Sequence, residues 1–316
     1  KFAASSIEGN LTVTSSNEIG ISQEGALTVE GTSSFTTSAD DADINLANTS
    51  NNLDGTVHFV TNDNSSGDGV YAGNVTLAHS DAIEIGTVNS VTSSIKGNLK
   101  IDTSATGAAL ADNGSIKVYG TTDLTATGNS ASVWFNGDRH DFDGVVTATS
   151  HHVRISTSDA LNTGTLTATR GQMVINTYGA ITQTGPWYAV TNTTVQAQNA
   201  AGTNQNITLN NTSNSFGGFS TSGTASSGNI ATGDHVILTG ADVTVKSDHT
   251  FNMGTSSITG DLTLVSGSAA GGSHTGITDE GNVTVGGDLS VETTLNNGVI
   301  DMETLLVDGK VTLKTH

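Results

Sequence analysis

The densest charged cluster in the sequence is residues 138–143 (Asp-Arg-His-Asp-Phe-Asp), followed by His151, His152 and Arg154. Carboxylates next to a histidine could hold a metal ion, or could act as acid and base in a polysaccharide lyase or hydrolase. However, Phe142 and the following Asp143 also fall on a repeated bend of the chain. We therefore expect these charges to face solvent and not to form a catalytic centre.

A second group of polar residues has the chemistry of a calcium site. Residues 61–69 place side-chain oxygens at Asn62, Asp63, Asn64 and Asp68 among glycines, and Ca²⁺ prefers such hard oxygen ligands. The spacing differs from an EF-hand loop because it lacks the distal bidentate glutamate. The alternative is an exposed polar loop, and the acidic residues 40–43 have the same two interpretations.

The aromatic residues provide a third kind of candidate site. Trp187 and Tyr188 follow the single proline, and Trp134 precedes Phe135. Exposed aromatic rings stack on sugar faces or become buried at interfaces, so Trp134, Trp187 and Tyr188 are predicted to contact a ligand. The alternative is that they pack into a local core. Trp134 aligns with a polar residue of the repeat, which predicts that it points outward.

These candidates lie on a repeated pattern. Residues 115–146 repeat residues 26–57 without a gap, at an offset of 89 (115 minus 26), and a looser copy occupies residues 207–218. Repeats of this kind dictate the architecture. The offset of 89 keeps seven pairs apolar: Leu27/Ile116, Val29/Val118, Phe35/Leu124, Ile44/Val133, Leu46/Phe135, Leu53/Phe142 and Val57/Val146.

Glycines recur at fixed places in the repeat. Gly31 corresponds to Gly120, and the Asp54–Gly55 pair corresponds to Asp143–Gly144. Since glycine accepts a positive φ without a Cβ clash, these positions predict bends that use that conformation. The repeating unit is an apolar triplet, a bend, a second triplet and a second bend.

Composition limits the classes of function. The 316 residues include 38 glycines, one proline and no cysteine, and the formal net charge is −20. The absence of cysteine excludes disulfides and thiol catalysis. The negative charge argues against nucleic-acid binding, which needs clustered positive charge. No apolar run is long enough to cross a bilayer, and the first residues show no signal-peptide core.

Most apolar clusters have the form apolar–polar–apolar, as in Leu11–Val13, Ile19–Ile21 and Val311–Leu313. Each such triplet is a short strand with two side chains facing inward. Strands this short must stack on equivalents above and below. The sequence therefore predicts an all-β protein, a parallel β-helix (β-solenoid). The alternative, a β-sandwich, needs longer strands and regular hairpins.

The spacing of the triplets predicts the size of the solenoid. A coil of roughly 20–25 residues gives about 13–16 coils over residues 1–316 as a single β-helix. Such a body would be an elongated rod on the order of 60–80 Å long. At its bends, Asn48, Asn51, Asn211 and Asn214 are expected to form hydrogen bonds between coils.

The phrases at residues 207–218, 26–31 and 287–291 resemble repeats of filamentous-haemagglutinin-like exoproteins, which are bacterial adhesins of the two-partner secretion type. The resemblance covers nearly the whole chain. It implies a right-handed β-helix, export across a bacterial outer membrane and an extended surface fibre. No N-terminal secretion domain of that family is recognisable.

Together these observations predict a non-enzymatic, extracellular structural fibre or stalk segment of a bacterial surface adhesin-like protein. Expected partners are other copies stacked end to end or adjoining repeats of a longer chain, and no cofactor is expected apart from calcium. One alternative is a glycan-binding flank that contacts host or neighbouring cells. A second alternative is a β-helical polysaccharide-degrading enzyme.

Overall fold

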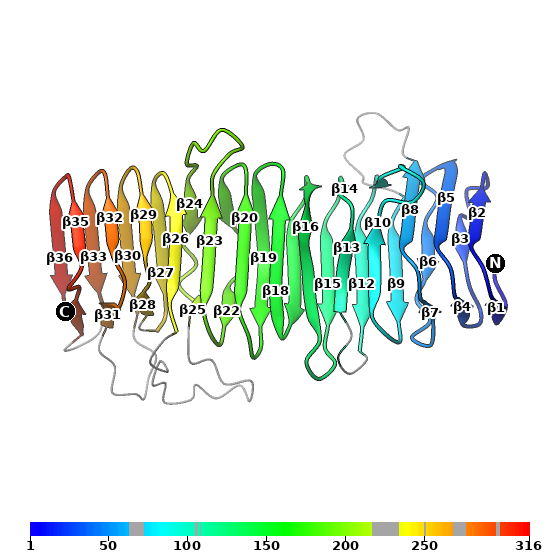
Figure 1. The fold of residues 1–316 in the computed structure, drawn as a ribbon, viewed down its shortest axis with the longest axis horizontal. Helices are drawn as coiled ribbons and strands as arrows, with labels where there is room; N and C mark the ends of the chain where they lie inside the picture. Colours follow the sequence, from blue (N-terminus) through cyan, green and yellow to red (C-terminus); the bar gives the residue numbers. More distant parts are fainter. Residues whose placement is uncertain are drawn as a thin grey trace. The chain divides into compact units, whose positions relative to one another are not determined.

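A computed structural model describes residues 1–62, 73–104, 107, 109–216, 234–249, 251–267, 276–294 and 298–316. In these residues the chain is all-β and has no helix, and its parallel strands stack as a β-solenoid of about 12 turns (Figure 1). The predicted fold class is therefore confirmed, and the right hand of the coil stays a prediction. In the described part of the chain no long apolar helix offers a membrane span.

Several turns are longer than expected, which lowers their number below 13–16. Asp43 and Asn74 are bonded across one turn although they lie 31 residues apart. Asn206 and Asp242 are bonded across another and lie 36 residues apart. Insertions in surface loops lengthen individual turns at little energetic cost.

The chain divides into two units: unit 1 is residues 1–151 with 155–158, and unit 2 is residues 152–154 with 159–316. The strands up to the boundary are β1 (Ser5–Ile7), β2 (Leu11–Ser15), β3 (Ile21–Ser22), β4 (Leu27–Val29), β5 (Ser33–Asp40), β6 (Ile44–Leu46), β7 (Asn52–Leu53), β8 (Val57–Asn62), β9 (Val75–His79), β10 (Ile83–Gly86), β11 (Ser93–Ile95), β12 (Leu99–Thr103), β13 (Ala109–Asn113), β14 (Ile116–Val118), β15 (Thr122–Ala126), β16 (Ser132–Phe142), β17 (Val146–Ser150) and β18 (His152–Thr157).

The remaining strands are β19 (Leu161–Ala168), β20 (Met173–Thr177), β21 (Ile181–Gln183), β22 (Trp187–Ala189), β23 (Thr193–Ala197), β24 (Ile207–Leu209), β25 (Ser215–Phe216), β26 (Val236–Gly240), β27 (Val243–Ser247), β28 (Phe251–Met253), β29 (Ser256–Ile258), β30 (Leu262–Ser266), β31 (Gly276–Asp279), β32 (Val283–Val285), β33 (Leu289–Thr293), β34 (Val299–Asp301), β35 (Leu305–Val307) and β36 (Val311–Thr315).

Each unit has two walls of parallel strands. In unit 1 the first wall begins with β2, β5 and β8, and the second wall is β3, β6, β9, β12, β15 and β17. In unit 2 the first wall begins with β20, β23 and β26, and the second wall includes β21, β24, β27, β30, β33 and β36. Figure 1 shows β30, β33 and β36 side by side, one turn apart.

The two walls of a turn differ in kind. One wall carries a continuous strand, and the other carries two short strands placed end to end. For example, β13 and β14 both pair with the continuous strand β16, and β21 and β22 both pair with β19. The split wall changes sides within each unit. In unit 1, β8 pairs with the single strand β5 on one side and with the two short strands β10 and β11 on the other. In unit 2, β26 pairs in the same way with β23 on one side and with β28 and β29 on the other.

This exchange of walls qualifies the predicted repeat. All seven apolar pairs of the offset of 89 are buried in the core, as expected. However, Phe35 lies on β5 of the first wall and its counterpart Leu124 lies on β15 of the second wall. The sequence repeat therefore preserves which residues of a turn are buried. It does not preserve the wall on which those residues lie.

The core consists of the inward side chains of successive turns. Phe35 and Phe59 occupy paired positions and stack with ring centroids 5.8 Å apart. Ile19 is an exception to the predicted triplets, since it is 81% exposed and precedes β3, which begins at Ile21. The Asn17 side chain accepts a hydrogen bond from the Ile19 amide (2.8 Å), which fixes a bend there.

The recurring glycines are needed for space and not for a positive φ, which corrects the prediction. Gly31 and Gly120 are not among the glycines with a positive φ, whereas a Cβ on Gly120 would lie 2.6 Å from the Gly97 oxygen. Successive corners touch through their backbones, and the Gly120 amide donates to the Gly97 carbonyl at 3.0 Å. Glycine is required because a neighbouring turn occupies the place of its side chain.

The predicted hydrogen bonds between coils are confirmed for Asn51 and Asn214, whereas the side chains of Asn48 and Asn211 accept from amides two residues ahead in the same bend. The Asn51 Nδ2 atom donates to the carbonyls of Leu46 (2.9 Å) and Ala78 (3.0 Å) and to Gln23 Oε1 (2.9 Å). Its Oδ1 atom accepts from the Leu27 amide (2.9 Å) and from Gln23 Nε2 (2.8 Å). One amide thus joins backbone groups of three turns.

Unit 2 repeats this arrangement around Asn214. Its Nδ2 atom donates to Gln183 Oε1 (2.9 Å) and to the carbonyls of Leu209 (3.3 Å) and Lys246 (2.9 Å). Its Oδ1 atom accepts from the Trp187 amide (2.8 Å) and from Gln183 Nε2 (2.9 Å). The two buried amide clusters are equivalent points of the two units.

We predict that Asn51→Ala and Asn214→Ala each destabilise the protein by about 2–4 kcal/mol, because each change leaves buried backbone and glutamine groups without partners. Chemical denaturation followed by circular dichroism measures the loss. Asn45→Ala is the matched control, since Asn45 is an exposed asparagine on β6. An Asn51→Ala variant as stable as this control would contradict the prediction.

Candidate functional site

The charged cluster at residues 138–143 lies mostly on β16 and not in a bend, and strand alternation separates its side chains. His140 and Phe142 point into the core, whereas Arg139, Asp141 and Asp143 lie on the outer side. The Arg139 Nη1 atom donates to the Thr157 carbonyl at 3.0 Å. Asp141 and Asp143 therefore do not converge with His140 on one site.

The outward acids bind a lysine of the preceding turn. Lys117 Nζ forms an ion pair with Asp141 and lies 3.5 Å from Asp143 Oδ2. It also lies 4.6 Å from the ring centroid of Tyr119, whose ring has Lys96 Nζ at 3.8 Å. Burial lowers the pKa of Lys117, but the hydrogen bond and charge of Asp141 and the charge of Asp143 outweigh it and raise the pKa overall. This cluster joins neighbouring turns of unit 1.

The buried His140 also has a structural role. It is fully buried, and its Nδ1 atom accepts a hydrogen bond from the Ile116 amide at 3.2 Å. Its Nε2 atom lies 3.7 Å from Asp112 Oδ2, and the rings of Phe135 and Phe142 flank it. A histidine enclosed in this way cannot reach a substrate at the surface.

His152 and Arg154 belong to unit 2 and share a partner there. His152 Nδ1 accepts from the Gln172 amide (3.1 Å), and Arg154 Nη2 donates to Gln172 Oε1 (3.2 Å). Burial lowers the pKa of His152, and the charge of Arg154 lowers it further. These contacts join neighbouring turns of the first wall.

The aromatic residues have different surroundings. Trp134 is 42% exposed and points outward, as predicted from its alignment. Trp187 is fully buried, and its Nε1 atom donates to Thr163 Oγ1 at 2.8 Å, so the expectation of an exposed ring is wrong for this residue. The strand β22 alternates, which places Trp187 in the core and leaves neighbouring Tyr188 partly exposed.

The calcium prediction falls largely outside the described residues. Asp63, Asn64 and Asp68 are not among them, and Asn62 Nδ2 donates to the Ser38 carbonyl at 3.3 Å. Asp43, of the second acidic group, accepts from the Asn74 amide at 2.7 Å. Within the described ranges no three acidic or histidine side chains gather as metal ligands. Calcium binding stays a prediction.

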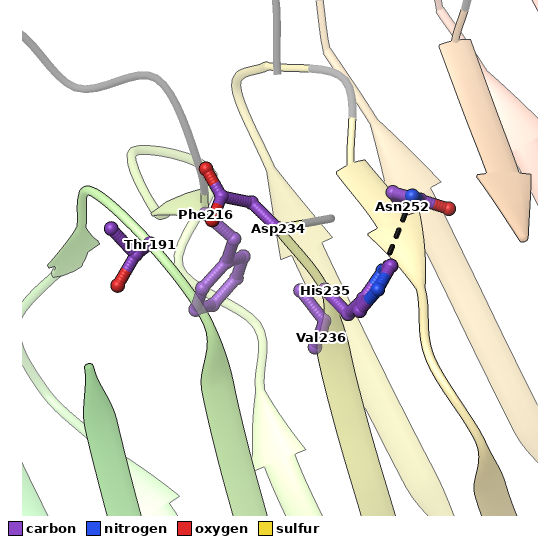
Figure 2. A pocket seen from close by; sticks show the side chains of 6 residues that line it. All are labelled: Thr191, Phe216, Asp234, His235, Val236 and Asn252. Atoms are coloured by element: carbon purple, nitrogen blue, oxygen red, sulfur yellow. Dashed lines mark hydrogen bonds between the residues drawn. The ribbon is translucent and has the colours of Figure 1, made fainter. Parts of the chain in front are cut away.

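A shallow hollow in unit 2 was not anticipated from the sequence. It is lined by Thr191, Phe216, Asp234, His235, Val236 and Asn252 (Figure 2). His235 Nδ1 lies 3.3 Å from Asn252 Nδ2, and His235 Nε2 lies 3.7 Å from Glu280 Oε2. Burial raises the pKa of Asp234, and the charge of His235 opposes this rise. Figure 2 shows Asp234 and His235 pointing to opposite sides.

His79 is a further buried residue that the sequence did not single out. Its Nε2 atom accepts from the Leu53 amide at 2.7 Å, and its Nδ1 atom lies 2.8 Å from the Asp81 carbonyl oxygen. These bonds require a neutral ring with the proton on Nδ1. Burial lowers the pKa of His79, with the hydrogen bond to Asp81 acting in the opposite direction. The imidazole replaces a missing strand beside β7, the last strand of the short ladder β1–β4–β7.

These features define a class of protein: a repetitive β-solenoid whose polar clusters join successive turns. The chain belongs to a family described as repeats of unknown function (DUF5649), whose model matches residues 1–60, 72–149 and 150–223. Comparison with curated proteins and with solved structures gives no match.

We predict that stability falls as the pH drops from about 6.5. The pKa of His79 in the folded protein is lowered from 6.5, so the stability that it contributes is complete above that pH and is lost as the pH falls through the folded pKa. His79→Gln, whose amide oxygen can accept from the Leu53 amide, should flatten this dependence. Melting temperatures of both proteins, measured from about pH 7.5 to about pH 5, give the dependence of stability on pH. If the melting temperature of the variant changes with pH as much as that of the unmodified protein, the assignment is contradicted.

Proposed function

We propose that this chain is a non-enzymatic structural segment of an extracellular fibre or stalk in a bacterial surface adhesin-like protein of the filamentous-haemagglutinin type. The repeat β-solenoid fold and the family of repeats support a structural role. Asp141 and Asp143 lie on the other side of β16 from the buried His140, which favours a role without catalysis. The resemblance of the repeat phrases supports the surface location and the adhesin class.

The observation that carries the proposal is the stacking of parallel strands turn upon turn, in which the inward apolar pair of each strand lies beside the pair of the next. Val311 is 46% exposed and Leu313 is 55% exposed. Their partners one turn earlier, Leu289 and Val291, are 1% and 0% exposed. An apolar pair that is in register with the core can pack against a further layer of strands. Other copies of the chain or adjoining repeats of a longer chain are the partners that such a face fits.

We predict that the protein self-associates and that Leu313→Asp abolishes this association. A carboxylate in the stacked interface costs about 3 kcal/mol or more, which corresponds to about a hundredfold in Kd. Sedimentation velocity over a range of concentrations measures it, and electron microscopy shows whether filaments form.

Val91→Asp is the matched control, because Val91 is 51% exposed in a bend of unit 1. This variant should associate like the unmodified protein. A single species that is independent of concentration in the unmodified protein would overturn self-association, and adjoining repeats would remain as the partner.

The outward ring of Trp134 favours a second candidate function, a glycan-binding flank. An exposed tryptophan on the outer side of a strand matches the apolar face of a sugar. In a net negative chain, neutral glycans are the better match because acidic ones are repelled.

We predict for this second candidate that Trp134→Ala weakens glycan binding about tenfold, the effect of losing one ring stack of about 1.4 kcal/mol. A panel of neutral and acidic oligosaccharides measures binding, with Val91→Ala as the control for the loss of an exposed apolar side chain. Equal binding by the unmodified protein and the Trp134 variant would rule out this contact.

A further inference from the structure

The outer face of the second wall of unit 2 carries a regular row of hydroxyl groups. The strands β21, β24, β27, β30 and β33 pair in this order, and Figure 1 shows β27, β30 and β33 side by side. One outward position of each strand pairs with the same position of the next strand. These positions form the hydroxyl row: Thr182, Thr208, Thr244, Thr263 and Ser290. Its neighbouring members are about 4.8 Å apart, the spacing of paired strands.

A second row lies at the corners that precede four of these strands. Asn206, Asp242, Asp261 and Asp288 are exposed, and each stands two residues before a member of the hydroxyl row. The four turns therefore share one order of residues: Asn or Asp, apolar, Thr or Ser, apolar. The two rows run parallel, roughly 6.6 Å apart along each strand. The three aspartates form the acid row.

Backbone amides hold the carboxylates of the acid row in place. The Asp261 amide donates to Asp242 Oδ1 (3.1 Å), and the Asp288 amide donates to Asp261 Oδ1 (2.8 Å). The Lys310 amide holds Asp288 in the same way (2.8 Å). Gly260 makes room for the first of these bonds, because a Cβ there would lie 2.0 Å from Asp242 Oδ1. Each carboxylate is thus fixed through Oδ1 and presents Oδ2 to a ligand, with little entropy to lose on binding.

The hydrogen bonds at these corners do not require a charge. In unit 1 the Asn98 amide donates to Asn74 Oδ1 (2.8 Å), and the Thr121 amide donates to Asn98 Oδ1 (2.7 Å). Asparagine therefore makes the same bonds, whereas like charges on adjacent strands repel. The acids of unit 2 add this repulsion without a further bond to the backbone, which favours a cationic partner for this face.

The hydroxyl row is likewise more regular than the stacking of strands requires. In unit 1 the paired outward positions of the second wall carry varied side chains: Asn45, Thr76, Lys100, Asp123 and Thr147. Lys100 Nζ lies 3.7 Å from Asp123 Oδ2, so two of these charges are paired within the chain. A second wall therefore forms without a hydroxyl at every turn.

We propose that this face of unit 2 binds an extended polysaccharide of β-1,4-linked amino sugars, which lies across the strands and along the two rows. The sugar units of such a chain recur at nearly the spacing of the strands, so each turn meets one sugar. The ammonium groups of the sugars pair with the acid row, and their hydroxyl groups form hydrogen bonds with the hydroxyl row. The net charge of −20 attracts a polycation to the chain. This site goes beyond the proposed fibre and does not involve Trp134.

The affinity of this face comes from repetition. An exposed ion pair changes an affinity by only about twofold. Contacts on one linked chain add their free energies, so binding should strengthen from the disaccharide to the tetrasaccharide and the hexasaccharide. Salt screens exposed charges, and added salt should weaken the binding.

Isothermal titration calorimetry with glucosamine oligomers tests the acid row. The triple variant Asp242→Asn/Asp261→Asn/Asp288→Asn gives unit 2 the asparagine corners found in unit 1. It keeps the corner bonds and should be at least as stable as the unmodified protein, which thermal denaturation checks. We expect it to bind the hexasaccharide about tenfold more weakly, since it loses three charged contacts.

A matched control removes the same charge from exposed acids of unit 1: Glu30→Gln/Asp54→Asn/Glu84→Gln. This variant should bind like the unmodified protein. The double variant Thr244→Val/Thr263→Val keeps the β-branched shape but removes two hydroxyl groups, and it should bind about fivefold more weakly.

Four results would overturn the proposal. They are no binding of the glucosamine hexasaccharide by the unmodified protein, equal binding by the triple variant, equal binding of the neutral N-acetylglucosamine hexasaccharide, and full displacement by spermine at equal charge. The last result would show a surface that binds any polycation. None of these results bears on self-association, which sedimentation of the Leu313 variant tests separately.

Discussion

The structure depends on one constraint: each short strand must find backbone partners in the turns before and after it. Strands of two to six residues dominate, and none of that length is stable alone. Parallel stacking supplies both the hydrogen bonds and the burial of the inward side chains. The apolar ladders are continuous for this reason, and the outer surface is free to carry serine, threonine and asparagine.

Where a wall changes from continuous to split, the backbone ladder is interrupted and side chains complete it. Ser93 Oγ accepts from the Phe59 amide (3.1 Å) and donates to the Gly86 carbonyl (2.6 Å). Ser256 Oγ accepts in the same way from the Leu238 amide (3.1 Å) in unit 2. The side chains of His79, Asn51 and Asn214 likewise form hydrogen bonds with backbone groups at the ends of short ladders. Buried polar groups are tolerated here because each one replaces a backbone partner that the fold cannot supply.

Alternation and repeats predicted the fold class, the burial of the apolar pairs and the outward side of Trp134. They could not reveal the exchange of walls, because an apolar triplet looks the same on either wall. The burial of Trp187 was not predicted, because the sequence around a tryptophan next to a proline does not show which face of the strand the ring occupies. Only the pairing of β22 with β19 places this ring in the core. The partners of Asn51 and His79 in neighbouring turns lie 24 to 28 residues away, and these contacts depend on coil lengths that the sequence left open.

The exchange of walls also explains why the repeat of the sequence is not a whole number of turns. A core layer consists of a split wall, a glycine corner and a continuous strand, and it packs equally well on either side of the solenoid. Packing therefore constrains the residues of a core layer, but it does not constrain the side of the solenoid on which the layer lies. Outward positions carry no such constraint: Asn45 and Trp134 occupy equivalent places and share no property. In this family of repeats the core layer sets the fold, and any recognition of a partner along the flank must reside in these variable outward residues.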